Sequence, residues 1–139
     1  MSSSGPIRVH PENPHYYLYD GRLTVLVTSA EHYGAVVNGA FDYVAYFDSL
    51  ARYGLNYTRI YPGFLFEPTD KFIRDNTLAP RPEDLILPWA RSREPGFALG
   101  GNKFDLDAWN PAFFQRLTDF VAQADRRGVV VEICFFNCQ

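Results

Sequence analysis

Cysteine and histidine, the residues that most often bind zinc, are scarce in this 139-residue sequence, which has two of the first and three of the second. Cys134 and Cys138 form a Cys-x3-Cys pair without partner histidines, a poor spacing for zinc. We interpret both as reduced packing residues. The expected first strand carries no His-x-His pair either, which argues against a metal-dependent hydrolase. We therefore expect neither a metal nor a cofactor.

The sequence also lacks a basic run and a long apolar run. Its formal net charge is −3, which gives no support to nucleic-acid binding. No apolar stretch approaches the ~20 residues of a membrane-spanning helix, so we expect no membrane partner. The start, MSSSGPIRVHPENP, has no apolar core of a secretory signal, which leaves a cytoplasmic location as the default expectation.

Aromatic side chains are abundant. Phenylalanine, tyrosine and tryptophan make up 17% of the chain, within an apolar fraction of 47% and a charged fraction of 21%. These values are typical of one globular domain. The aromatic rings have two interpretations, as core packing or as platforms on which sugar rings stack.

Two helix–glycine–strand units are expected along the chain. The first is a helix over about 42–53, ended by Gly54 and followed by a strand over 55–61. The second begins with Asn110 as N-cap and Pro111, ends at Gly128, and leads into a strand over 129–136. The residues expected to face the sheet are Val44, Phe47, Leu50 and Ala51 on the first helix and Phe113, Leu117, Phe120, Val121 and Ala124 on the second.

A helix, a glycine cap and an apolar strand that recur in this order indicate an α/β fold. We expect the N-terminal part of a (β/α)8 TIM barrel, with about three strands and two helices. An N-terminal β-hairpin over 7–22 precedes a first strand over 23–28, and the three strands are expected to be parallel and adjacent. Residues 63–108 hold five of the ten prolines and no periodicity, so we expect a long loop there. Residues 1–139 would then form an incomplete barrel domain, the first piece of a longer enzyme.

The ligand site of such a barrel lies where the strands end, which selects the candidate substrate-binding residues. The candidates lie near the ends of the expected strands or in the long loop. They are Glu31, His32, Arg59, Tyr61, Trp89 and Asn137. Glu31 and His32 cannot both point inward, because successive side chains of a strand alternate. Trp89 is either a sugar platform or an anchor that packs the loop.

Arg59 and Glu132 are charged residues expected inside two neighbouring strands, so each needs a partner for its charge. Each is a charged residue inside a segment otherwise suited to burial, and arginine is rarely buried without an acidic partner. One interpretation is a structural ion pair between them. The other is that Arg59 orients a catalytic carboxylate from elsewhere in the protein, and the two are compatible.

The segment Gly54-Leu55-Asn56-Tyr57-Thr58-Arg59-Ile60 resembles strand two of the clan A glycoside hydrolases. More narrowly, the chain is similar to the cellulase-like β/α-barrel enzymes related to family 5, and the likeness extends over most of residues 7–137. The resemblance implies that Arg59 supports the catalytic nucleophile. It places the acid/base glutamate at the end of strand four and the nucleophile at the end of strand seven, beyond the strands expected here. The chain departs from the family pattern where strand three ends, with Asn137-Cys138 in place of a histidine.

The leading hypothesis is an N-terminal fragment of a retaining glycoside hydrolase that acts on an oligosaccharide or polysaccharide. Its expected partners are the carbohydrate and either the rest of the barrel or a second copy of the chain. Retention needs two carboxyl groups about 5–5.5 Å apart, and Glu31, Glu67 and Glu132 are not assigned to that role. We expect no catalytic residue in this chain and no activity from it alone. The alternative is a noncatalytic carbohydrate-binding or scaffold protein with a barrel-like fold.

Overall fold

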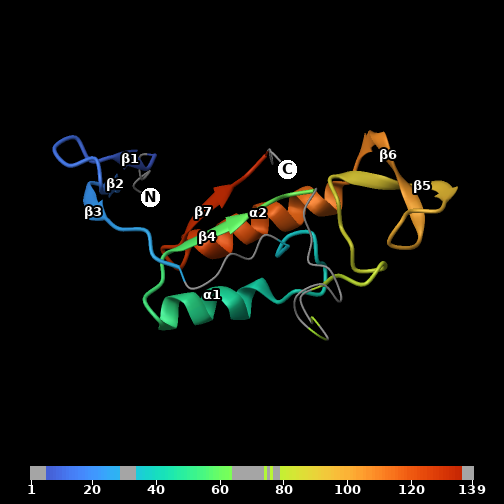
Figure 1. Ribbon diagram of the computed structural model, residues 1–139, viewed down its shortest axis with the longest axis horizontal. Helices are drawn as coiled ribbons and strands as arrows, with labels where there is room; N and C mark the ends of the chain where they lie inside the picture. The colour runs from blue at the N-terminus through green and yellow to red at the C-terminus, as the bar shows by residue number, and fades with distance from the viewer. Residues whose placement is uncertain (1–5, 29–33, 64–73, 75, 77–78, 136–139) are drawn as a thin grey trace.

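The computed structural model describes residues 6–28, 34–63, 74, 76 and 79–135, and it is a mixed α/β structure (Figure 1). Within this part of the chain the elements are β1 (Arg8–Val9), β2 (Tyr17–Tyr19), β3 (Arg22–Thr24), α1 (Tyr43–Arg52), β4 (Tyr57–Ile60), β5 (Trp89–Pro95), β6 (Asn102–Trp109), α2 (Pro111–Asp125) and β7 (Val130–Ile133). No helix among these residues is long and apolar enough to cross a membrane.

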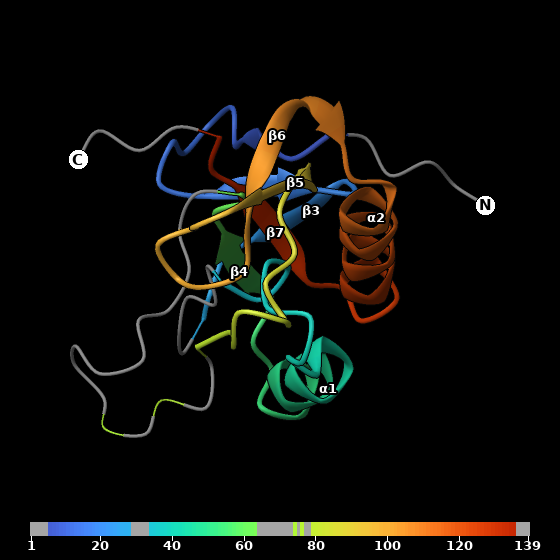
Figure 2. The same cartoon turned by 90° about the vertical axis from the view of Figure 1, so that its right-hand side faces the viewer.

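The middle of the molecule is a parallel pair of strands, β4 and β7, in the register Tyr57↔Val130 to Ile60↔Ile133. Figure 1 shows both helices running alongside this pair, and Figure 2 shows it end on with α2 to one side and α1 below. The rings of Phe47 and Phe120 meet between the helices, with their centroids 4.7 Å apart. The expected parallel pairing of these two strands is therefore confirmed.

The two helices begin and end where capping chemistry predicts. The Asp42 carboxylate accepts from the backbone N–H of Ala45 at 2.9 Å, and the Asn110 side chain accepts from that of Ala112 at 3.2 Å. Gly54 and Gly128 follow the helices with φ of 69° and 67°, the left-handed conformation that glycine adopts without strain. These contacts fix where each helix begins and ends.

The core lies between the helices and one face of the central strands. Phe47, Leu50, Phe113, Phe120 and Ala124 are buried there, as expected from the helical stripes. Val44, Ala51 and Val121 were expected to face the sheet, and this is wrong, because the two valines are 37% and 40% exposed and Ala51 is exposed as well. The contact between Phe47 and Phe120 sets the rotation of each helix, and it turns the two valines toward the rim.

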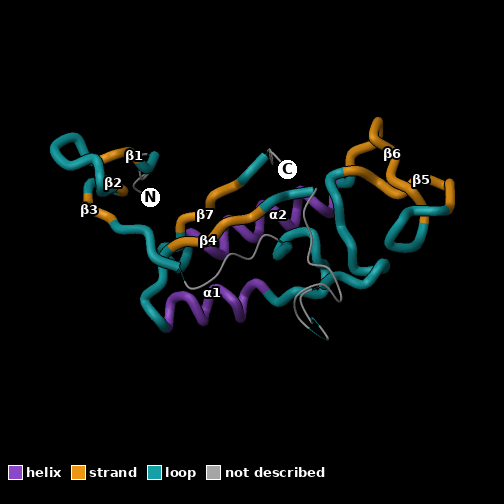
Figure 3. The backbone as a smooth tube through the Cα atoms, in the orientation of Figure 1, coloured by secondary structure: helices purple, strands orange, loops and turns teal. Residues whose placement is uncertain are grey.

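The prediction of a first parallel strand over 23–28 is also wrong. Asp20 and Gly21 both have positive φ, and this turn folds β3 back antiparallel onto β2, which pairs antiparallel with β1 (Figure 3). The strand ends at Thr24. Residues 25–27 instead meet the Asn56 side chain, which accepts from the N–H of Val27 at 2.8 Å and donates to the carbonyl of Val25 at 2.9 Å. Among the described residues, the parallel sheet therefore consists of β4 and β7 alone.

Residues 63–108, expected as a loop without regular structure, contain most of an antiparallel hairpin. Trp89 pairs with Trp109 at its base and Pro95 with Asn102 near its tip, with register shifts between. Sequence periodicity misses it because the shifts break the alternation of apolar and polar residues. Arg91 holds the hairpin together, since its guanidinium lies 4.0 Å from the centre of the Phe104 ring.

Candidate functional site

One face of the central strands is polar. In a parallel pair, residues opposite each other share a face, so the register puts Arg59 and Glu132 on the same side. The opposite side carries Thr58 and Ile60, which are fully buried toward the helices. Thr58 is the polar exception there, and its hydroxyl is hydrogen bonded to that of Tyr46 at 2.8 Å. The sheet therefore turns an apolar face to the helices and a charged face away from them.

The charged face is centred on the predicted ion pair. Arg59 Nε lies 3.0 Å from Glu132 Oε2, and the side chains are 31% and 41% exposed. The Tyr57 hydroxyl donates a hydrogen bond to the same carboxylate oxygen. At this exposure an ion pair contributes little to stability, because solvent screens it. The contacts matter more for orientation, because the Arg59 guanidinium and the Tyr57 hydroxyl both hold the Glu132 carboxylate.

These contacts perturb the protonation of their members. The hydrogen bond from Tyr57 holds the pKa of Glu132 below its usual range, with Arg59 acting in the same direction against the effect of burial. Burial and the neighbouring carboxylate raise the pKa of Tyr57 to about 12. At neutral pH, Glu132 is therefore an anion and Tyr57 a neutral donor. A carboxylate held in this way cannot serve as a general acid.

The carboxyl end of this face adds a thiol and a phenol. Cys134 is a free cysteine, and its Sγ lies 3.5 Å from Glu132 Oε1. Burial, followed by the nearby carboxylate, raises the pKa of this thiol, and a hydrogen bond with Tyr61 opposes the rise. A thiol with a raised pKa is a poor nucleophile, so this cysteine is a hydrogen-bonding residue rather than a reactive one.

Two tryptophans stand near the carboxyl end of β4. Gly63, three residues after that strand, is so close to the base of the β5–β6 hairpin that a Cβ on it would lie 2.7 Å from Pro88 and 3.8 Å from the Trp89 ring. Trp89 stacks on Trp109 with ring centroids 6.4 Å apart and planes 18° apart. Figure 1 shows the hairpin at the end of the molecule toward which the β4 arrow points. The aromatic pair therefore lies at the end where a β/α fold binds ligands.

Arg116 of α2 secures the loop that precedes α1. Its guanidinium donates to the carbonyls of Ala35, Val36, Asn38 and Phe41, and it lies 4.7 Å from the centre of the Tyr43 ring. Burial lowers its pKa. An arginine that satisfies four carbonyls ties residues 35–41 to α2.

The six residues expected at the site fall into three groups. Arg59 and Tyr61 lie on or just after β4, and Arg59 forms the ion pair described above. Trp89 is half-buried and packs on the core, as an anchor does, while its ring also backs Trp109. Glu31, His32 and Asn137, with Glu67, lie outside the described residues.

Two residues of the site were not anticipated. Tyr57 lies two positions before Arg59, so strand alternation puts both on one face, and this spacing was the available signal. Trp109 immediately precedes the helix N-cap Asn110, and that place in the sequence gives no sign of exposure. Its side chain is 66% exposed in the structure.

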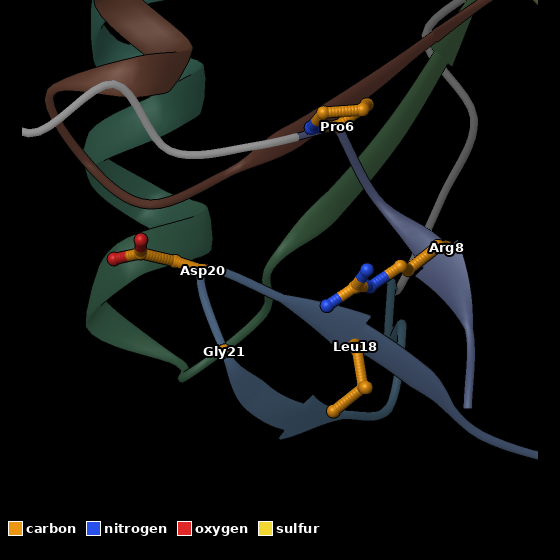
Figure 4. A pocket seen from close by; sticks show the side chains of 5 residues that line it. All are labelled: Pro6, Arg8, Leu18, Asp20 and Gly21. Atoms are coloured by element: carbon orange, nitrogen blue, oxygen red, sulfur yellow. The ribbon is translucent and has the colours of Figure 1, made fainter. Parts of the chain in front are cut away.

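The hollow at the other end of the molecule is poorly suited to a ligand. This hollow, shown in Figure 4, is lined by Pro6, Arg8, Leu18, Asp20 and Gly21, beside the β1–β3 sheet at the amino end of β4. Its Asp20 carboxylate points away from the Arg8 guanidinium, so the two charges do not converge (Figure 4). Within the described ranges no group of three or more acidic, histidine or cysteine side chains could hold a metal ion.

Comparison with known proteins gives one informative likeness. No family model and no curated protein matches the chain. Among solved structures, the chain is similar to the crystal structure of "a putative glycoside hydrolase from Bacteroides vulgatus ATCC 8482". The TM-score is 0.65 and the identity 21%, over 96% of this chain and 24% of that one. The likeness shows that the fold of this chain matches a part of that protein, and the chain spans about a quarter of its length.

Proposed function

We propose that this chain is the N-terminal part of a β/α-barrel glycoside hydrolase, related to the cellulase-like enzymes of family 5 and clan A. The enzyme would cleave an oligosaccharide or polysaccharide with retention of anomeric configuration. The observation that carries the proposal is the Arg59–Glu132 pair on the sheet face turned away from both helices. The similarity of the fold to a part of the Bacteroides vulgatus protein supports it.

In this proposal the polar face of β4 and β7 lines the inside of the barrel. Within these two strands, Glu132 is the sole carboxylate, and its lowered pKa keeps it an anion at neutral pH. Retention requires two carboxyl groups about 5–5.5 Å apart, one as the nucleophile and the other as the proton donor. We place both catalytic carboxylates on later strands of a longer protein. The role of this chain is then to orient the nucleophile through Arg59 and to contact the sugar.

The role of Arg59 is tested in a longer protein that carries this segment. We expect Arg59→Ala to lower kcat more than it raises KM, because the arginine would act on the charge of the nucleophile and not on ground-state sugar binding. Steady-state hydrolysis of an aryl β-glycoside gives both constants. An unchanged kcat would reduce Arg59 to a structural residue.

Arg127→Ala is the matched control for that variant. Arg127 also forms an ion pair, with Nε 2.7 Å from Asp48 Oδ1, but it joins the two helices on the other side of the strands. Its removal is expected to lower the melting temperature and to leave kcat and KM unchanged at a temperature where the protein is folded. Equal losses of kcat in both variants would indicate a general effect on stability.

A noncatalytic carbohydrate-binding protein is the second candidate function, and the exposure of Trp109 favours it. The two candidates share a sugar ligand and differ in turnover. Binding of oligosaccharides by the longer protein without any hydrolysis would favour this second function.

A further inference from the structure

Trp109 is unusual among the large apolar side chains because it is exposed and yet held in place. Its side chain is 66% exposed, although Trp89 stacks on one of its faces and the Phe114 ring meets it edge-on at 5.7 Å. These two contacts leave most of the indole surface accessible. An exposed indole that is also packed against two other rings can serve as a rigid contact surface for a ligand.

The backbone on both sides of Trp109 is fixed as well. The residue ends β6 opposite Trp89, and the next residue, Asn110, donates its N–H to the Pro88 carbonyl at 2.7 Å. The Asn110 side chain donates to the Leu87 carbonyl at 3.1 Å and caps α2. Trp109 is thus anchored between a strand pair and a helix start. A ring held in this way loses little conformational freedom when a ligand stacks on it.

The chemistry around the ring favours a neutral, hydroxyl-rich ligand. Asp105 and Asp107 precede Trp109 in the same strand and are exposed. Carboxylates accept hydrogen bonds from hydroxyl groups and repel the phosphates of nucleotides. An aromatic face complements the apolar C–H face of a pyranose ring. Trp89 at the carboxyl end of β4 puts the platform at the end where the ligand of a β/α fold binds.

We infer that Trp109, backed by Trp89, is a platform on which one pyranose unit of a sugar chain stacks. For the class of ligand, this inference rests on the proposed function. It assigns the two tryptophans different roles, since Trp89 is the half-buried support and Trp109 is the contact surface.

The chain offers a direct readout, because these are its only two tryptophans. The 139-residue chain is kept at micromolar concentration and titrated with β-1,4-linked hexasaccharides of glucose, xylose and mannose while the indole emission is recorded. We expect at least one of them to shift the emission and to protect the indole from quenching by acrylamide. No response to any of the three at millimolar concentration would overturn the inference.

Variants separate the platform from the rest of the surface. Trp109→Ala is expected to weaken binding of the responding hexasaccharide about tenfold or more, measured by calorimetry, and Trp109→Phe to keep most of it. Tyr53→Ala, which removes an aromatic side chain that is 75% exposed at the end of α1, is the control and should bind normally. If Trp109→Ala does not fold, the acrylamide experiment on the unaltered chain still decides. Equal binding by folded Trp109→Ala and the unaltered chain would contradict the inference.

The same measurements distinguish this inference from the proposed function. An emission response to a hexasaccharide, without turnover by the longer protein, would support the Trp109 platform and contradict the proposed hydrolase function. The opposite result is turnover by the longer protein with no emission response and an unchanged KM in Trp109→Ala. It would support the hydrolase function and contradict the platform.

Discussion

At the scale of single residues, the Glu132 carboxylate is the centre of the polar face. Three side chains meet it, the Arg59 guanidinium, the Tyr57 hydroxyl and the Cys134 thiol. The sequence predicted the arginine because a charged residue in an apolar strand needs a partner. It did not predict the tyrosine or the thiol, whose contacts depend on the register of β4 against β7.

The lowered pKa of Glu132 gives a prediction about acid stability. A carboxyl group whose pKa is lower in the folded state stabilises the fold above its unfolded pKa, and this contribution is lost as the pH falls through the folded value. Glu132→Gln is therefore expected to flatten the fall of the free energy of unfolding in acid, measured by urea titrations at a series of pH values.

Glu83→Gln is the control for this measurement. Glu83 forms an exposed ion pair with Arg81 at 3.6 Å and lies far along the chain from the central strands. The acid limb of its stability curve should match that of the unaltered chain. A Glu132→Gln curve parallel to the unaltered one would show that the contacts of Glu132 do not survive in solution.

At the scale of elements, the helices were predictable and the first strand was not. Capping residues act over three or four positions, so Asp42, Asn110 and the two glycines specify helix ends locally. The LTVLVT run has the composition of a strand, but its partner is chosen by the Asp20-Gly21 turn. Strand propensity does not specify which strand lies alongside, because pairing depends on contacts distant in sequence.

Asn56 shows the same limit in the motif that carried the resemblance. Its side chain reaches the backbone of Val25 and Val27, about thirty positions earlier in the sequence. The β5–β6 hairpin was hidden for a related reason, since its register shifts remove the alternation that marks a strand. The first feature depends on contacts distant in the sequence, and the second on register shifts that conceal the strand pattern.

The packing of the two helices is tested by a pair of adjacent substitutions. Phe120 is fully buried against Phe47, so Phe120→Ala is expected to cost ~3–5 kcal/mol of unfolding free energy. Val121→Ala, one position further, changes a side chain that is 40% exposed and should cost less than ~0.5 kcal/mol. Chemical denaturation of both variants measures the difference. Similar losses would mean that the helix is rotated relative to the structure described here.

At the scale of the whole molecule, the chain has apolar surface that its own described residues leave exposed. Leu23, Val25 and Val27 are between 46% and 58% exposed and recur at every second position. β4 and β7 form a two-stranded sheet, and strand edges without neighbours pair with other chains. We propose that the rest of a barrel covers these surfaces in a longer protein.

The prediction that follows concerns the chain by itself. We expect it to self-associate as its concentration rises, because exposed strand edges and apolar stripes favour pairing. Light scattering coupled to size-exclusion chromatography measures the mass in solution. A monomer at all concentrations, with the melting behaviour of a cooperative domain, would contradict the view that these surfaces need a partner.

The central claim is that this chain supplies part of a sugar site while the catalytic carboxylates come from elsewhere. It is tested most directly by assaying aryl β-glycoside hydrolysis with the purified 139-residue chain beside a longer protein that carries it. The account predicts no turnover by the chain and turnover by the longer protein, with a first product of retained configuration in nuclear magnetic resonance spectra. Robust turnover by the 139-residue chain alone would contradict it.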